Sequence, residues 1–237
     1  MKEIRIHGRG GQGAVTAARM LASAFVIEGK YVASFPMYGF ERRGAPVQAF
    51  TRLDDKPIRE KTQVYNPDCM VVIDPTLLKL STLFSGLKPG GILIVNSSSF
   101  NSQADKNLAV AGVIDATKIA VEEIGRDIPN TCLLGAFAAT TQWINLESII
   151  KSLSEYLSGD MLQRNTRSVE RGFREVKIIK WPEKRNSNIH MRVAGRMPTS
   201  CYCIWRPGLG GPASPRSIKR SAPTAVSALS IAPHSVC

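Results

Sequence analysis

The sequence contains no hydrophobic run long enough to cross a bilayer, which requires about 18–20 consecutive apolar residues. Cysteine is scarce, with five residues in 237, and the alternating charges of residues 1–6 do not form a secretory signal. Five cysteines without such a signal do not indicate a disulfide framework. We therefore expect a cytoplasmic protein that has no contact with a membrane.

The chain also lacks the short motifs of common hydrolases and metalloenzymes. It contains neither G-x-S-x-G nor H-E-x-x-H, and none of its three histidines has a partner at metal-ligand spacing. No internal repeat of solenoid length is visible. These absences argue against a metal site in this chain.

Positive charge is present in excess, with a formal net charge of +12, but it is distributed unevenly. Residues 181–237 contain eight basic residues and one acidic residue, a balance of +7. Residues 1–180 contain 23 basic and 18 acidic residues, a balance of only +5. Because the charge over this main part is mild, we do not expect it to bind nucleic acid.

Up to residue 180, short apolar runs alternate with stretches of helical periodicity, which predicts an α/β protein. The apolar strands indicate an open, mostly parallel, Rossmann-like sheet with helices on both faces. We expect strands at residues 4–7, 31–35, 47–53, 69–73, 92–95 and 108–114. We expect helices at residues 14–27, 116–124, 132–143, 146–157 and 160–176.

The pattern is lost after Trp181-Pro182. Residues 181–237 hold seven of the chain's 14 prolines, and Ser, Arg, Pro and Gly dominate residues 206–221. Such a composition buries too little apolar surface to offset the entropy of ordering. We therefore divide the chain into a domain at 1–180 and an irregular, basic C-terminal tail at 181–237. The tail is either disordered or a non-native product of a shifted reading frame.

A glycine-rich loop, G-R-G-G-Q-G at residues 8–13, lies between the first expected strand and the first helix. Gly8, Gly10 and Gly13 have the G-x-G-x-x-G spacing that permits a sharp turn and close approach to a phosphate. A dinucleotide site also requires an acidic residue about 20 residues further on. The second strand ends without one, at Phe35-Pro36, which disfavours NAD. A phosphate-bearing ligand, a subunit contact and close internal packing remain open.

A second unusual loop follows the second expected strand. It combines aromatic residues and an acidic residue with Arg42, Arg43 and Gly44 at the carboxyl end of a strand, where open α/β sheets place their ligands. Two adjacent arginines can hold a carboxylate or phosphate, or form pairs across an interface. We expect a ligand site or an interface, and the alternative is a solvated surface on which Glu41 pairs with an arginine.

Four other residues invite interpretation from their positions. Cys69 and Cys132 lie in apolar segments, which favours buried structural thiols over reactive ones. His7 closes the first strand, where a local backbone hydrogen bond is favoured over a ligand contact. Asp74 ends an apolar strand before a proline, so either helix capping or a ligand contact would explain it.

Three motifs occur in order and at close spacing: the G-R-G-G-Q-G loop, G-F-E-R-R-G at residues 39–44, and Asn66-Pro67-Asp68 before an apolar strand. Together they resemble the gamma subunit or domain of 2-oxoacid:ferredoxin oxidoreductases, in the pyruvate/2-oxoisovalerate branch. The resemblance covers roughly residues 1–178. It implies a subunit of a complex that oxidatively decarboxylates a 2-oxoacid, usually to an acyl-CoA, and passes the electrons to ferredoxin. The isolated chain would be inactive.

The resemblance also implies partners and cofactors. Alpha, beta and delta-type subunits would hold thiamine diphosphate, Mg and [4Fe-4S] clusters, and the complex would use coenzyme A, while this chain alone would bind none of these. It implies no catalytic residue here. The residues implied to contact a ligand or another subunit are those of the two loops: Gly8, Gly10, Gly11, Gln12 and Gly13, and Glu41, Arg42, Arg43 and Gly44.

In some members of this family a ferredoxin-like segment follows the gamma domain. The tail begins where that segment would begin, but it lacks the C-x-x-C-x-x-C-x-x-x-C-P run that a [4Fe-4S] cluster requires, and Cys201-Tyr202-Cys203 is too tightly spaced. This difference favours a shifted reading frame over an evolved tail. Two functions outside the family stay open: a stand-alone nucleotide-binding oxidoreductase, and nucleic-acid binding through the tail.

Overall fold

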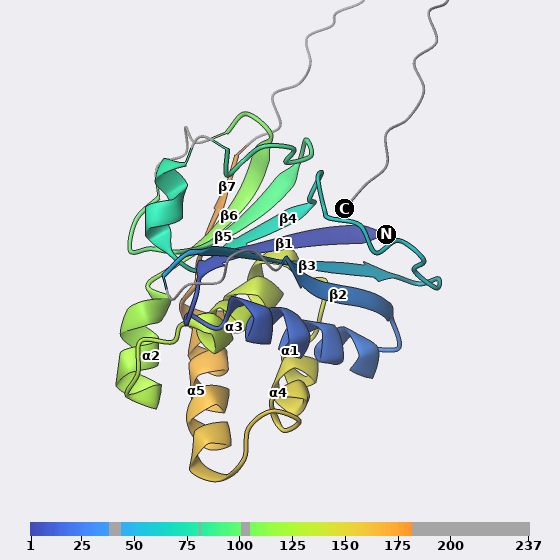
Figure 1. Cartoon of the computed structure of the whole chain (residues 1–237). Coiled ribbons are helices and arrows are strands. Elements are labelled where there is room, and N and C mark those ends of the chain that lie inside the picture. The colour runs from blue at the N-terminus through green and yellow to red at the C-terminus, as the bar shows by residue number, and fades with distance from the viewer. Residues whose placement is uncertain (38–43, 81, 101–104, 182–237) are drawn as a thin grey trace, which may run out of the picture. The chain divides into compact units, whose positions relative to one another are not determined.

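The computed structural model describes residues 1–37, 44–80, 82–100 and 105–181 (Figure 1). These residues form one seven-stranded sheet with the strand order β2-β3-β1-β4-β5-β6-β7. The strands are Lys2–Arg9 (β1), Tyr31–Met37 (β2), Pro46–Asp54 (β3), Cys69–Val72 (β4), Gly91–Asn96 (β5), Leu108–Ile114 (β6) and Lys177–Lys180 (β7). The helices are Ala14–Ile27 (α1), Ala116–Ile124 (α2), Asn130–Thr141 (α3), Leu146–Leu153 (α4), Gly159–Glu175 (α5) and the short 3-10 helix Pro75–Lys79 (η1).

The α/β class is confirmed, and its centre is the parallel set β1, β4, β5 and β6. Antiparallel strands extend this set on both sides, because β3 pairs with β1 and β2, and β7 pairs with β6. The predicted helices α1 and α2 and the strand β6 are confirmed residue for residue, and the ends of the other predicted elements shift by a few residues. The short strand β7, of four residues, was not predicted.

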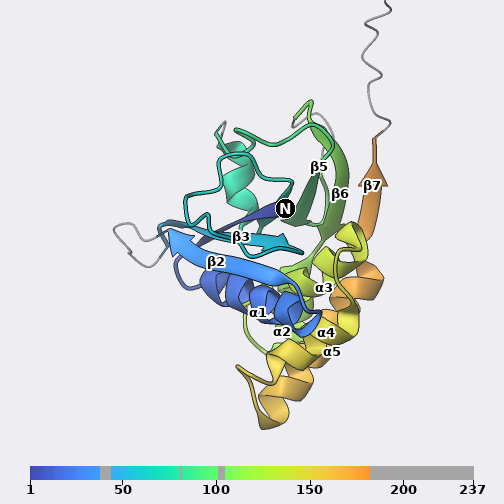
Figure 2. The ribbon, with the colours of Figure 1, turned by 90° about the vertical axis from the view of Figure 1, so that its right-hand side faces the viewer.

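Each face of the sheet has its own apolar core. All five α-helices in the described part of the chain pack on one face (Figures 1 and 2), against side chains that include Ile4, Ile6 and Val71. On the other face, η1 and the turns after it cover Met70 and Val72. The sequence predicted helices on both faces. The second face instead has a 3-10 helix and turns, because prolines and glycines interrupt the segment from residue 75 to residue 91.

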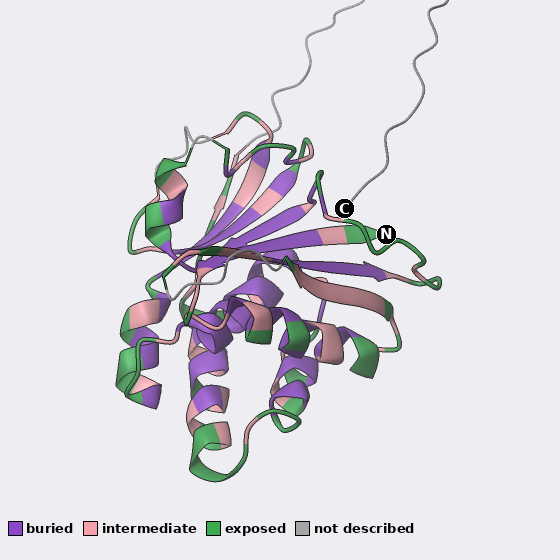
Figure 3. Cartoon of the chain, in the orientation of Figure 1, coloured by how far each residue is buried: buried purple, intermediate pink, exposed green. Residues whose placement is uncertain are grey.

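Helix α3 is buried on almost every side, as Figure 3 shows. It lies between the sheet and α5. Two glycines allow the close contact between α3 and α5. A Cβ added at Gly135 of α3 would overlap the carbonyl oxygen of Val169, and one at Gly172 of α5 would overlap that of Cys132. The two helices therefore touch backbone to backbone.

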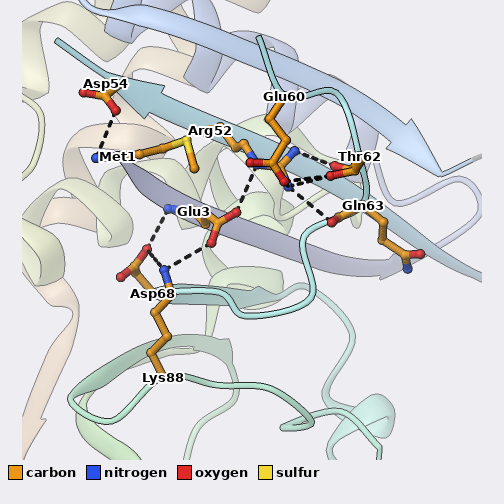
Figure 4. A network of polar contacts seen from close by, with 9 residues as sticks. All are labelled: Met1, Glu3, Arg52, Asp54, Glu60, Thr62, Gln63, Asp68 and Lys88. Atoms are coloured by element: carbon orange, nitrogen blue, oxygen red, sulfur yellow. Dashed lines mark hydrogen bonds and ion pairs between the residues drawn. The ribbon is translucent and has the colours of Figure 1, made fainter. Parts of the chain in front are cut away.

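A buried ionic network ties the strands together at the end of the sheet opposite the glycine loop (Figure 4). Arg52 of β3 is fully buried, and its Nε donates to Glu3 Oε1 at 3.0 Å. Its terminal nitrogens donate to the carbonyl oxygens of Thr62 and Gln63. Lys88 Nζ lies 3.1 Å from the other Glu3 carboxylate oxygen. The network joins β1 and β3 to two connecting segments.

We predict that Gly172→Ala destabilises the fold by about 1–3 kcal/mol, the usual cost of overpacking a close contact. The steric cost must outweigh the gain of about 1 kcal/mol in helix propensity when alanine replaces glycine. Denaturant unfolding followed by circular dichroism measures the change. Gln163→Ala, at an exposed position of the same helix, is the matched control and should change little. An unchanged or raised stability of Gly172→Ala would contradict the backbone contact.

Candidate functional site

The glycine loop lies at the carboxyl ends of the neighbouring strands β1 and β4. After β1 the chain turns to α1 on the helical face of the sheet, and after β4 it turns to η1 on the opposite face. Neighbouring parallel strands whose connections leave in opposite directions form the crevice in which open α/β sheets bind ligands. The glycine loop therefore lies where folds of this class bind ligands, and its role in contacting a ligand or another subunit stays a prediction.

The glycines of the loop have separate structural roles. Gly8 packs against α1, because an added Cβ would lie 3.1 Å from the Cβ of Ala14. Gly13 has φ = 76° and faces Asn130, which an added Cβ would approach to 2.5 Å. Gly11 also has a positive φ, of 98°, but it is exposed and has open space around it. Close packing thus accounts for Gly8 and Gly13.

The structure brings the two predicted loops together where it describes both of them. Gly10 N donates to Ala45 O at 2.9 Å, and Gly44 N donates to Gly10 O at 3.2 Å. Arg9 adds a third bond, from its guanidinium Nη1 to Gly44 O at 3.0 Å. Glu41, Arg42 and Arg43 lie outside the described residues. The glycine loop therefore holds the end of the second loop directly.

Asp74 connects the carboxyl end of β4 to both loops. Its Oδ2 lies 3.1 Å from Arg9 Nε and accepts a hydrogen bond from Gln12 Nε2 at 2.9 Å. Gln12 in turn accepts a bond from Arg9 N at 2.8 Å, which closes the loop on itself. Asp74 Oδ1 accepts from Thr76 N at 2.9 Å and so caps η1. The capping expectation is confirmed, and the bond to Gln12 is one that the sequence did not predict.

These contacts give the strand ends a defined charge. Burial by itself would raise the pKa of Asp74, but hydrogen bonds from Thr76 and Gln12 and the charge of Arg9 lower it below its usual value. Asp74 is therefore a carboxylate that pairs with Arg9, and this pairing leaves no uncompensated positive charge here for a phosphate. In addition, β3 separates β1 from β2, so the end of the second strand is not adjacent to the loop. Neither feature favours a dinucleotide.

His7 is buried beside the glycine loop on the η1 face. Arg5 Nε donates to His7 Nε2 at 3.0 Å, so the imidazole serves as a neutral acceptor. Burial and the charge of Arg5 lower the pKa of His7 to about 3. Arg5 also donates to the carbonyl oxygens of Leu83 and Ser85, at 2.8 Å each. His7 thus bonds to a side chain, where the sequence favoured a local backbone contact.

The remaining candidates have structural roles or stay unassigned. Cys69 and Cys132 are buried, and burial raises the pKa of both thiols, that of Cys132 to about 12, as expected for structural cysteines. Within the described ranges, no three His, Cys, Asp or Glu side chains are placed to hold a metal ion. No helix described there is long and apolar enough to cross a bilayer. Cys201 and Cys203 lie outside the described residues.

We predict that His7 produces a pH-dependent loss of stability. Because its pKa is lowered from 6.5 to about 3, only the unfolded state takes up a proton between these values, and the free energy of unfolding falls as the pH falls. Below pH 6.5 the slope is about 1.4 kcal/mol per pH unit. Urea unfolding of the wild type and His7→Gln at pH 7, 6 and 5 measures it. If the free energy of unfolding falls equally with pH in the wild type and in His7→Gln, the prediction is contradicted.

We predict that Asp74→Asn costs about 1–3 kcal/mol at pH 7, the worth of hydrogen bonds to a charged group. The pKa of Asp74 is lowered below 3.8, so its contribution is present above that pH and is lost as the pH falls through the lowered value. The difference in free energy of unfolding between the wild type and Asp74→Asn should disappear at acidic pH, as measured by denaturant unfolding. Asp127→Asn, at an exposed position, is the control. If this difference in stability persists at pH 2, it does not come from the charge of the Asp74 carboxylate.

Comparisons with known proteins find relatives over most of the chain. The profile of the pyruvate ferredoxin/flavodoxin oxidoreductase family matches residues 3–175. The pyruvate/ketoisovalerate oxidoreductases common subunit gamma of Thermococcus kodakarensis is 50% identical over 182 residues, which are 75% of this chain and 98% of that protein. The pyruvate synthase subunit PorC of Methanothermobacter thermautotrophicus is 47% identical over 180 residues, with 76% and 98% covered.

A solved structure gives the same result. The crystal structure of pyruvate oxidoreductase subunit PORC from Thermotoga maritima superposes with a TM-score of 0.68 at 43% sequence identity. The superposition covers 76% of this chain and 98% of that one. Sequence, fold and length of match are therefore consistent with one another, and the chain belongs to the pyruvate ferredoxin/flavodoxin oxidoreductase family.

Proposed function

We propose that this chain is the gamma subunit of a multi-subunit, pyruvate-type 2-oxoacid:ferredoxin oxidoreductase and that it is active only within that complex. The observation that carries the proposal is the near-complete match to relatives that are themselves named as gamma or PorC subunits. A match over nearly their whole length relates this chain to the entire subunit, whereas a shared fold alone would not establish a function.

The substrate chemistry would take place in other chains. Alpha, beta and delta-type subunits would hold thiamine diphosphate with Mg and the [4Fe-4S] clusters, and they would form the site at which a 2-oxoacid is decarboxylated and coenzyme A is acylated. Electrons would then pass to ferredoxin. This division of labour fits a glycine loop whose Arg9 is paired internally with Asp74.

The role of this chain would be to present its two loops to the assembly as one unit. The backbone hydrogen bonds between Gly10 and residues 44–45 fix the end of the second loop. The Arg9 guanidinium also donates a hydrogen bond to the carbonyl oxygen of Gly44. Through Gln12 and Asp74, this arrangement is anchored to β4 and η1. A loop with a rigid base can contact a partner subunit or a ligand at a lower entropic cost.

We infer that the functional unit is residues 1–180. About 180 residues suffice to match nearly the whole length of the relatives, which leaves about a quarter of this chain without a counterpart in them. The tail at 181–237, whether disordered or the product of a shifted reading frame, adds nothing to this function. Intact mass spectrometry of the chain from its native host distinguishes the two origins of the tail.

The direct test of the proposal is anaerobic affinity purification of the full chain from its host, with mass spectrometry of the retained proteins. We expect large thiamine-binding chains and ferredoxin-like polypeptides in stoichiometric amounts, together with 2-oxoacid-dependent reduction of ferredoxin. Recovery of the chain alone, folded and without partners, would overturn the proposal. Titration with NAD would then test the nucleotide-binding alternative.

We predict that Arg42→Ala combined with Arg43→Ala impairs the assembled complex while the subunit remains folded. Loss of a charged contact to a partner or ligand should lower the affinity for the other subunits, or kcat/KM, by at least about tenfold, which corresponds to about 1.4 kcal/mol. Reconstitution followed by ferredoxin-reduction kinetics measures both quantities. Lys106→Ala with Arg126→Ala removes the same charge from exposed sites elsewhere and is the control. If the two double variants lower affinity or kcat/KM equally, Arg42 and Arg43 have no specific role in the complex.

A further inference from the structure

The outer edge of β2 and the exposed side of α1 form a groove that the two loops do not use. Strand β2 pairs with β3 on one side, and no described residue pairs with it on the other. The groove has a volume of about 460 Å³, and α1 contributes Arg19, Ala22, Ser23 and Val26 to its lining. We call this surface the edge groove. Figure 2 shows β2 and α1 side by side at this edge.

The backbone of β2 has unused hydrogen-bonding groups in the edge groove. Pro36 has no N–H, yet its strand pairs with β3 from Tyr31 to Met37 without interruption. Proline fits such a strand when its nitrogen faces away from the neighbouring strand. Residues two and four positions earlier have the same orientation, so the N–H groups of Val32 and Ser34 also face outward. An open strand edge of this kind is a template for pairing with another strand.

Three large apolar or aromatic side chains beside this edge are exposed. The exposed fraction is 59% for Val26, 43% for Ile27 and 40% for Tyr156. The Tyr156 hydroxyl lies 3.0 Å from Ser23 Oγ, which places its ring against α1. Ala22 is small and would let a second helix approach closely. Apolar groups gathered beside an open strand edge indicate a surface that another protein covers.

The charges of the edge groove indicate which protein that is. Arg19 and Glu155 both line it, and within the described parts of the chain neither takes part in an ion pair. A surface with one cation and one anion is complementary to itself after a rotation of 180° about an axis that passes midway between the two charges. An interface about a two-fold axis uses the same patch on both subunits and requires this property.

We propose that a second copy of this chain docks on the edge groove about a two-fold axis. The β2 strands of the two copies pair antiparallel and make one continuous sheet, and the two α1 helices lie side by side beneath it. Pairing centred on Ala33 uses the N–H groups of Val32 and Ser34 and requires none from Pro36. The proposed axis passes between Arg19 and Glu155, so that Arg19 of each copy faces Glu155 of the other. This interface does not depend on the proposed function.

Sedimentation equilibrium of the full chain over a wide concentration range tests the proposal. We expect a dimer whose dissociation constant rises at least about tenfold in Val26→Lys, because a lysine charge would be buried in the interface. Val121→Lys is the matched control, since Val121 is 51% exposed on α2, outside the edge groove. The control should retain the wild-type dissociation constant.

A charge exchange tests the symmetry of the interface. Arg19→Glu and Glu155→Arg should each weaken the dimer, because each places like charges opposite one another, and the double variant should restore it. A wild-type chain that is monomeric at every concentration would overturn the proposal, as would equal effects of Val26→Lys and Val121→Lys or a double variant without rescue. Cross-links from the edge groove to a different subunit of the complex would identify another occupant and would also overturn it.

Discussion

The backbone contact between α3 and α5 is the constraint on which the site depends. Because Gly135 and Gly172 have no side chains, α5 can press the buried helix α3 against the sheet. The first residue of α3, Asn130, then closes against Gly13, and its Nδ2 donates to Gly13 O at 3.4 Å. That contact fixes the point at which the glycine loop turns into α1. Wider spacing of the two helices would shift Asn130 and release the loop.

The glycine loop illustrates how one local sequence pattern can serve different purposes. In dinucleotide-binding folds, glycines at this spacing bring the backbone close to a pyrophosphate. Here Gly8 and Gly13 bring the backbone close to Ala14 and Asn130, and the loop's Arg9 is paired with a carboxylate. The pattern therefore predicts the strand, turn and helix correctly, whereas the ligand depends on residues that are remote in the sequence.

The same distinction explains which features were predictable. Helix α1 follows from apolar residues at spacings of three and four, and the two loops could be located from their composition. The bond between Gln12 and Asp74 and the ladder between Gly10 and Gly44 could not, because each joins segments whose proximity depends on the strand order. The insertion of β3 beside β1 has no local signature, since an antiparallel strand and a parallel strand have similar composition when both are buried.

The position of β1 has a consequence for the order in which the chain folds. Of the seven strands of this sheet it is synthesised first, yet it lies inside the sheet, where Lys2 pairs with Leu53 and Ile4 pairs with Cys69. Neither neighbour exists while α1 is being synthesised, so β1 must stay unpaired until β3 and β4 have emerged. Contacts between such distant residues slow folding, because a long loop must be closed before any pairing energy is gained. During synthesis, β1 is therefore the strand of this sheet that waits longest for its first partner, and its buried residues Ile4 and Ile6 stay accessible to aggregation and to chaperones for that time.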